Sequence, residues 1–149
     1  MSERDVHEAS RENVGYLLAK ASQRWNELLH ERFRREGFDE VRPSYGSILL
    51  SLFEEDGLRM GELAECARLS KQTMTTMIRL IERDGLVRRQ RDPADRRAFR
   101  VYLTARARSF GPVAESVLRE LDELVQERLS QAELSRLKTS LKEVMSLCC

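Results

Sequence analysis

The chain has 149 residues, which suits one domain or one domain with a dimerisation arm, and its formal net charge is only +1. No apolar run approaches the ~20 residues needed to span a bilayer, and the polar N-terminus lacks the apolar segment of a signal peptide. We therefore expect a cytoplasmic protein without a membrane partner.

Helical patterns dominate the first half of the chain. Apolar residues recur at three- and four-residue spacing over about residues 10–35, which predicts a long helix. A second helix is expected from Pro43 to about residue 55, because proline fits the first turn of a helix. A short helix follows at about 60–68. The next one begins after Ser70, a suitable N-cap, and stops at Asp84-Gly85.

The periodicity then changes from helix to strand. Residues 86–90 and 99–103 resemble two short strands that bracket a turn. Thr104 is expected to cap a long helix that reaches about residue 128, and residues 131–147 form the last predicted helix.

The terminal helices pose a burial problem. A helix of some 25 residues extends ~37 Å, which is longer than a small core can cover, so its apolar stripe needs another partner. A second copy of the same chain is the simplest partner, giving an intertwined helical homodimer. The alternative is that the two ends pack only on each other within a monomer.

The helices at 60–68 and 70–84 have the spacing of a helix-turn-helix. The second helix buries an apolar stripe, so its other faces are free to meet DNA, and its early residues reach base edges. Gln72 suits adenine, and Thr75 or Thr76 suits a thymine methyl group. Arg79 suits guanine or a phosphate. The predicted DNA-binding residues of this helix are Ser70, Lys71, Gln72, Thr73, Thr75, Thr76 and Arg79.

The predicted hairpin that follows is rich in arginine. Residues 71–100 hold nine basic and four acidic side chains, so the positive charge is concentrated in a fifth of the chain. This concentration is typical of a protein whose partner is double-stranded DNA. Asp95 can fix the turn by accepting hydrogen bonds, while Arg96 or Arg97 inserts into a narrow minor groove. Arg89 and Arg91 complete the predicted DNA-binding set. The alternative is a local surface ion-pair cluster of little energetic value.

These residues resemble the multiple antibiotic resistance regulator (MarR) family of winged helix-turn-helix repressors. The matching segments are Gly61-Glu62-Leu63-Ala64, residues 69–75, residues 81–89, Asp92-Pro93-Ala94-Asp95-Arg96-Arg97-Ala98 and Val101-Tyr102-Leu103-Thr104. The resemblance implies a mainly α fold with a small β-wing and a homodimer on a pseudo-palindromic operator. Two positions depart from it: Thr76 stands where relatives often carry arginine, and Arg79 where many carry an acid. The base preference is therefore expected to differ.

The resemblance also implies a division of the chain and a ligand site. Residues 1–36 and 105–149 would form the helical dimerisation region, and residues 37–104 the DNA-binding lobe. A cleft between them would hold a small effector, often phenolic, that relaxes repression. The aromatic candidates for this cleft are Tyr16, Trp25, Tyr45 and Phe53, although aromatic residues at helical spacing are more often core.

The sequence leaves three other functions to consider: a cysteine switch, a protein-interaction module and an enzyme. A redox or metal switch would use Cys66, where oxidation would disturb DNA binding, or the vicinal pair Cys148-Cys149; a small helical cysteine is more often inert. A winged-helix lobe that has lost DNA binding would be a protein-interaction module, which the retained arginines disfavour. The cysteines form neither a disulfide framework nor a zinc spacing, and no glycine loop or nucleophile-base pair is present. We therefore expect no metal, no cofactor and no enzyme.

Overall fold

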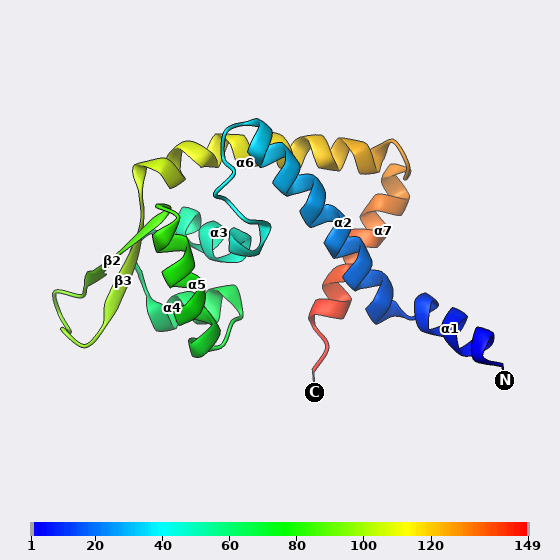
Figure 1. Cartoon of the computed structure of the whole chain (residues 1–149), viewed down its shortest axis with the longest axis horizontal. Coiled ribbons are helices and arrows are strands. Elements are labelled where there is room, and N and C mark those ends of the chain that lie inside the picture. Colours follow the sequence, from blue (N-terminus) through cyan, green and yellow to red (C-terminus); the bar gives the residue numbers. More distant parts are fainter. Residues whose placement is uncertain (1, 149) are drawn as a thin grey trace.

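The computed structural model describes residues 2–148, apart from the side chains of residues 7–9. Helices dominate, and a small antiparallel sheet lies near the middle of the chain (Figure 1). In chain order the elements are α1 (Glu3–Glu12), α2 (Val14–Arg35), the 3-10 turn η1 (Pro43–Tyr45), α3 (Gly46–Glu54), β1 (Leu58–Arg59), α4 (Met60–Ala67), α5 (Lys71–Arg83), β2 (Val87–Arg91), β3 (Phe99–Leu103), α6 (Ala105–Gln126) and α7 (Gln131–Met145).

The sheet has the strand order β1-β3-β2 with antiparallel pairing throughout. Val87 pairs with Leu103 and Arg91 with Phe99, so β2 and β3 form one hairpin that projects from the lobe (Figure 1). The two-residue β1 pairs with β3 at Leu58 and Val101. The sequence pattern did not predict β1, because two residues are too short to show an alternation.

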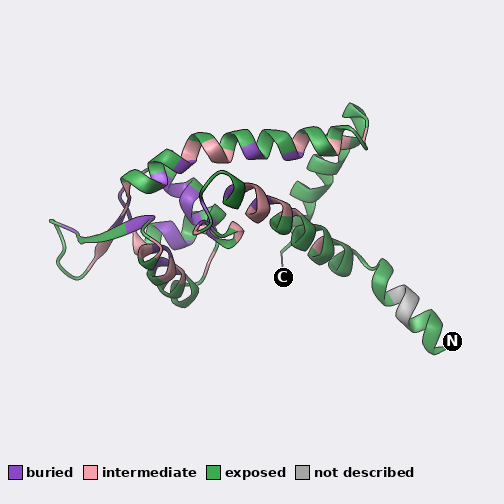
Figure 2. Ribbon diagram, turned by 45° about the horizontal axis from the view of Figure 1, so that its top comes forward, coloured by how far each residue is buried: buried purple, intermediate pink, exposed green. Residues whose placement is uncertain are grey.

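The core lies where α3, α4, α5 and the sheet pack beneath the first half of α6. Buried residues gather in this part of the chain (Figure 2). The α5 helix contributes Met74, Ile78 and Ile81 to it at 0–1 % exposure, so one face of α5 is fixed and the opposite face is open. The predicted winged helix-turn-helix, mainly α with a small β-wing, is confirmed.

The long helices leave the lobe and stay largely exposed (Figure 2). The second half of α2 packs on α6, where the rings of Phe33 and Phe110 meet edge to face at 4.8 Å and Arg32 pairs with Glu120 at 3.3 Å. None of the 15 residues of α7, all of them described, is buried. Within residues 2–148, no helix is long and apolar enough to cross a membrane.

Capping residues set several helix boundaries. The Ser70 and Thr104 side chains accept hydrogen bonds from the backbone N–H groups of Thr73 and Ala107, so both predicted N-caps are confirmed. The helix expected over 10–35 is divided instead. Asn13 has extended backbone angles, and its side chain accepts a hydrogen bond from the N–H of Tyr16, which starts α2 afresh.

Candidate nucleic-acid interface

One face of α5 is buried and the other carries the residues predicted to read DNA. Lys71, Gln72, Thr73, Thr75, Thr76 and Arg79 are all exposed, as is the N-cap Ser70. The buried stripe holds the helix against the core, so this exposed face has a fixed orientation relative to the rest of the lobe.

The start of α5 uses two of the predicted residues for its own stability. The Ser70 hydroxyl accepts from the Thr73 N–H at 3.1 Å and donates to the Thr73 hydroxyl at 2.9 Å. The Ser70 hydroxyl is therefore used as both donor and acceptor at the helix start, while the Thr73 hydroxyl accepts and keeps its own proton.

The hairpin turn is organised by Asp95. Its carboxylate accepts a hydrogen bond from the Arg97 N–H at 3.0 Å, and its carbonyl accepts one from the Ala98 N–H at 3.0 Å. The guanidinium of Arg91 donates to the Arg96 carbonyl at 3.0 Å. The side chains of Arg96 and Arg97 are exposed at the tip. The loop-amide bond expected of Asp95 is present, and it leaves both tip arginines directed to solvent.

The base of the hairpin is held by Asp92, which sequence reasoning left out of the site. Its side chain is 1 % exposed, and its Oδ2 atom lies 2.6 Å from Nε of Arg59 and 3.3 Å from Nε of Arg100. Its Oδ1 atom accepts from the Ala94 N–H at 2.9 Å. The Ala94 hydrogen bond and the two guanidinium charges hold the pKa of Asp92 below its usual value, against the effect of burial.

This carboxylate therefore joins β1, β3 and the turn of the hairpin. The only signal for it in the sequence is an acid at the end of β2 facing basic residues. Without knowledge of β1, Arg59 could not be placed beside it.

A second ion pair ties the hairpin to α5. The Glu82 carboxylate accepts hydrogen bonds from the Arg89 N–H at 3.1 Å and from its guanidinium at 3.1–3.3 Å. These bonds lower the pKa of Glu82, with the side-chain bond as the largest cause. Arg89 was predicted to contact DNA. In the structure its guanidinium donates to Glu82 of α5. This bond fixes the angle between α5 and the hairpin of β2 and β3, which is the wing of the fold.

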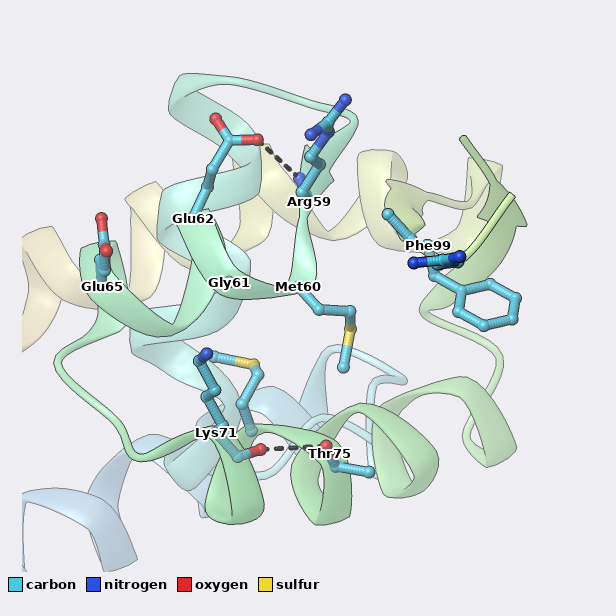
Figure 3. Close-up of a pocket in the computed structure, with 11 residues that line it drawn as sticks. Arg59, Met60, Gly61, Glu62, Glu65, Lys71, Thr75 and Phe99 are labelled. Carbon is cyan, nitrogen blue, oxygen red and sulfur yellow. Dashed lines mark hydrogen bonds between the residues drawn. The ribbon is translucent and has the colours of Figure 1, made fainter. Parts of the chain in front are cut away.

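A groove of about 540 Å³ separates α5 from the wing. Figure 3 shows Lys71 and Thr75 of α5 on one side and Phe99 of β3 on another, with Arg59 at the start of α4. Arg97 also lines it. Glu62 and Glu65 line the groove as well, and Arg59 is paired with Asp92, so Lys71 and Arg97 are the basic side chains that could hold a phosphate between α5 and the hairpin.

The four aromatic candidates for a ligand cleft line neither of the two grooves described for this structure. Tyr16 and Phe53 are exposed, and Trp25 is partly buried. Tyr45 differs from the expectation of an open cleft, because its side chain is 1 % exposed and its hydroxyl donates to Asp84 at 2.5 Å, within the core. For the other three, the cleft role stays a prediction.

A different groove, of about 680 Å³, lies between α2 and the start of η1. Its lining includes Asn26, His30, Arg42 and Ser44. None of the four aromatic candidates belongs to the lining of this groove. No sequence pattern marks this groove, because its polar lining residues resemble an ordinary solvated helix face.

The cysteines lie apart from these contacts. Cys66 is exposed on α4, and Cys148 is exposed after α7, while Cys149 lies outside the described residues. A redox role for Cys66 stays a prediction. Over the described part of the chain, no group of three or more His, Cys, Asp or Glu side chains could hold a metal ion.

Comparisons with known proteins agree with this geometry. A model of the MarR family matches residues 43–99. The transcriptional regulator HosA of Escherichia coli O111:H- is 30% identical over 115 residues, which cover 77% of this chain and 84% of HosA. The HTH-type transcriptional repressor Rv2887 of Mycobacterium tuberculosis (strain H37Rv) is 34% identical over 98 residues, covering 66% of this chain and 70% of the repressor.

A solved structure shares the fold. The transcriptional repressor CouR, bound to a 23-mer DNA duplex, has a TM-score of 0.76 at 24% identity, covering 90% of this chain and 93% of CouR. All three similar proteins are named as regulators of transcription, not as enzymes. With the helix-turn-helix, the arginine-tipped wing and these relatives in agreement, the chain belongs to the MarR family of transcriptional regulators.

Proposed function

We propose that the chain is a cytoplasmic repressor that binds a pseudo-palindromic operator as a homodimer and is released by a small aromatic or phenolic ligand. The observation that carries the proposal is the fixed placement of the exposed α5 face beside a wing whose turn is held by Asp95. Two of the similar proteins, Rv2887 and CouR, are named as repressors, which supports repression over activation.

In this proposal α5 enters the major groove and the wing reaches the adjacent minor groove. Gln72 and Arg79 carry the polar groups suited to base edges or phosphates. Arg97 and Arg96 supply positive charge where a narrow minor groove has its most negative potential. Lys71 lines the groove between them and suits the intervening phosphates, while Arg59 holds Asp92 at the base of the hairpin.

The unpartnered apolar side chains of the terminal helices support a dimer. Leu137, Leu141 and Val144 of α7 are 37–41 % exposed, and Leu17 of α2 is 48 % exposed. Side chains of this size at helical spacing are normally covered, and a second copy offers the same stripe in return. The division into residues 1–36 with 105–149 and residues 37–104 is part of this proposal.

The groove between α2 and η1 supports the effector part. It lies between a helix of the proposed dimerisation region and the start of the DNA-binding lobe, as a ligand site that controls DNA binding requires. His30 and Arg42 line it together with Glu27. Arg42 would favour an acidic ligand, and Glu27 offsets part of its charge.

The test begins with selection from random duplex DNA by the purified protein, followed by sequencing. We expect an enriched inverted repeat whose half-sites lie about one helical turn apart. Hydroxybenzoates are then titrated against the bound operator, and release by one of them supports the effector site. Failure to enrich any sequence with folded protein would contradict sequence-specific binding. A symmetric operator that no hydroxybenzoate releases would contradict only the phenolic effector.

A further inference from the structure

Two adjacent threonines on the exposed face of α5 bond back to their own helix. The Thr75 hydroxyl donates to the Lys71 carbonyl at 2.9 Å, and the Thr76 hydroxyl donates to the Gln72 carbonyl at 3.2 Å. Figure 3 shows the Thr75 hydroxyl turned toward the Lys71 carbonyl. Both side chains are exposed, so core packing does not account for this arrangement.

The intrahelical bonds change what these threonines offer to a partner. A threonine hydroxyl has one proton to donate, and here the helix backbone receives it in both cases. Recognition of a base edge through that proton would first require the intrahelical bond to break. The methyl group requires no such change, because it is the part of the side chain that the bond leaves free.

The neighbouring hydroxyls of α5 differ from these two. Ser70 donates its proton to the Thr73 hydroxyl oxygen at the helix start, so Thr73 keeps a hydroxyl proton that can reach a partner, in contrast to Thr75 and Thr76. The middle of the exposed face thus has no free hydroxyl proton at Thr75 and Thr76, and the methyl group is the apolar part that each of them presents. In the major groove, the apolar feature that distinguishes one base is the C5-methyl group of thymine.

We infer that Thr75 and Thr76 act through their methyl groups and select thymine at the base pairs they meet. The inference rests on the proposed entry of α5 into the major groove. It makes these residues specificity determinants by apolar contact, with hydrogen-bonding readout left to the side chains around them.

The test removes the methyl group on the protein side of the contact and, separately, the methyl group on the DNA side. Thr75→Ser and Thr76→Ser keep the hydroxyl and lose the methyl, while deoxyuridine in place of thymidine keeps the base pair and loses the C5-methyl group. Operator duplexes obtained by selection are synthesised with each thymidine replaced in turn. The dissociation constant is measured by fluorescence anisotropy for every combination of protein and duplex.

We expect the unsubstituted protein to lose affinity about fourfold at one or two thymines per half-site, the effect of one buried methyl group. At those positions the matching serine variant should lose nothing further, so the two changes are not additive. Thr139→Ser is the matched control, because Thr139 is an exposed threonine of α7 whose hydroxyl bonds to the Ser135 carbonyl in the same way. It should bind like the unsubstituted protein.

The inference is overturned if no deoxyuridine position weakens binding, or if the serine variants lose the same factor on both duplexes. Either result would leave operator binding, and hence the proposed function, intact. Absence of any selected operator would instead overturn both. Circular dichroism of the serine variants confirms that each is folded before its affinity is compared.

Discussion

The hydroxyl of Tyr45 links the start of α3 to the end of α5, and the substitution Tyr45→Phe removes this hydroxyl. The ring is 1 % exposed, and the hydroxyl donates to Oδ2 of Asp84, the C-cap of α5, at 2.5 Å. A hydrogen bond to a charged group contributes about 1.5–3 kcal/mol. Asp84 keeps 17 % side-chain exposure and a contact of 3.4 Å with Arg83, so the lower part of the range, about 1.5–2 kcal/mol, is expected.

Thermal denaturation followed by circular dichroism measures this loss. For a chain of this size, 1 kcal/mol corresponds to roughly 2–4 °C, so Tyr45→Phe should lower the Tm by about 3–8 °C at pH 7. Tyr16→Phe is the matched control, because Tyr16 is 38 % exposed, and its effect should stay within about 0.5 kcal/mol. Equal Tm values for Tyr45→Phe and the unsubstituted protein would refute the reasoning.

The same bond gives a pH dependence. Burial, and then the hydrogen bond to Asp84, raise the pKa of Tyr45 above its ordinary value. The folded state therefore favours the protonated phenol, so its contribution is complete below the unfolded pKa of about 10 and is lost as pH rises through the folded pKa. The Tm difference between the two proteins should narrow above about pH 10, and a constant difference would contradict this assignment.

Three further changes test the wing and the dimer. Arg97→Ala should weaken operator binding by about 1–3 kcal/mol, measured by anisotropy, and unchanged affinity would remove the wing from the mechanism. Glu82→Gln should cost less than about 1 kcal/mol in urea unfolding at pH 7, because the pair with Arg89 is about one-third exposed. Since Arg89 lowers the pKa of Glu82, that cost should vanish as pH falls below about 4, and its persistence there would exclude the ion pair. Leu141→Glu should convert a dimer into monomers in sedimentation velocity, whereas an unaltered mass would show that α7 is outside the interface.

The sequence predicted the elements whose signals are local. The caps Ser70 and Thr104, the hairpin and the apolar stripe of α5 follow from short-range chemistry, and the structure has them where expected. What it missed depends on contacts between distant segments. Asp92 meets Arg59 only once β1 pairs with β3, and the hydroxyl of the buried Tyr45 is satisfied by Asp84, 39 residues further along the chain. The sequence does not indicate whether the hydroxyl of a tyrosine such as Tyr45 bonds to another residue of the protein or to a ligand.

The central claim is that α5 lies in the major groove while the wing tip enters the minor groove beside it. Hydroxyl-radical footprinting on the selected operator tests this most directly, because it reports sugar protection at single-nucleotide resolution. We predict two symmetric protected half-sites one helical turn apart, flanked by minor-groove protection that Arg97→Ala abolishes. Flanking protection that persists in Arg97→Ala, or a single asymmetric footprint, would contradict the account.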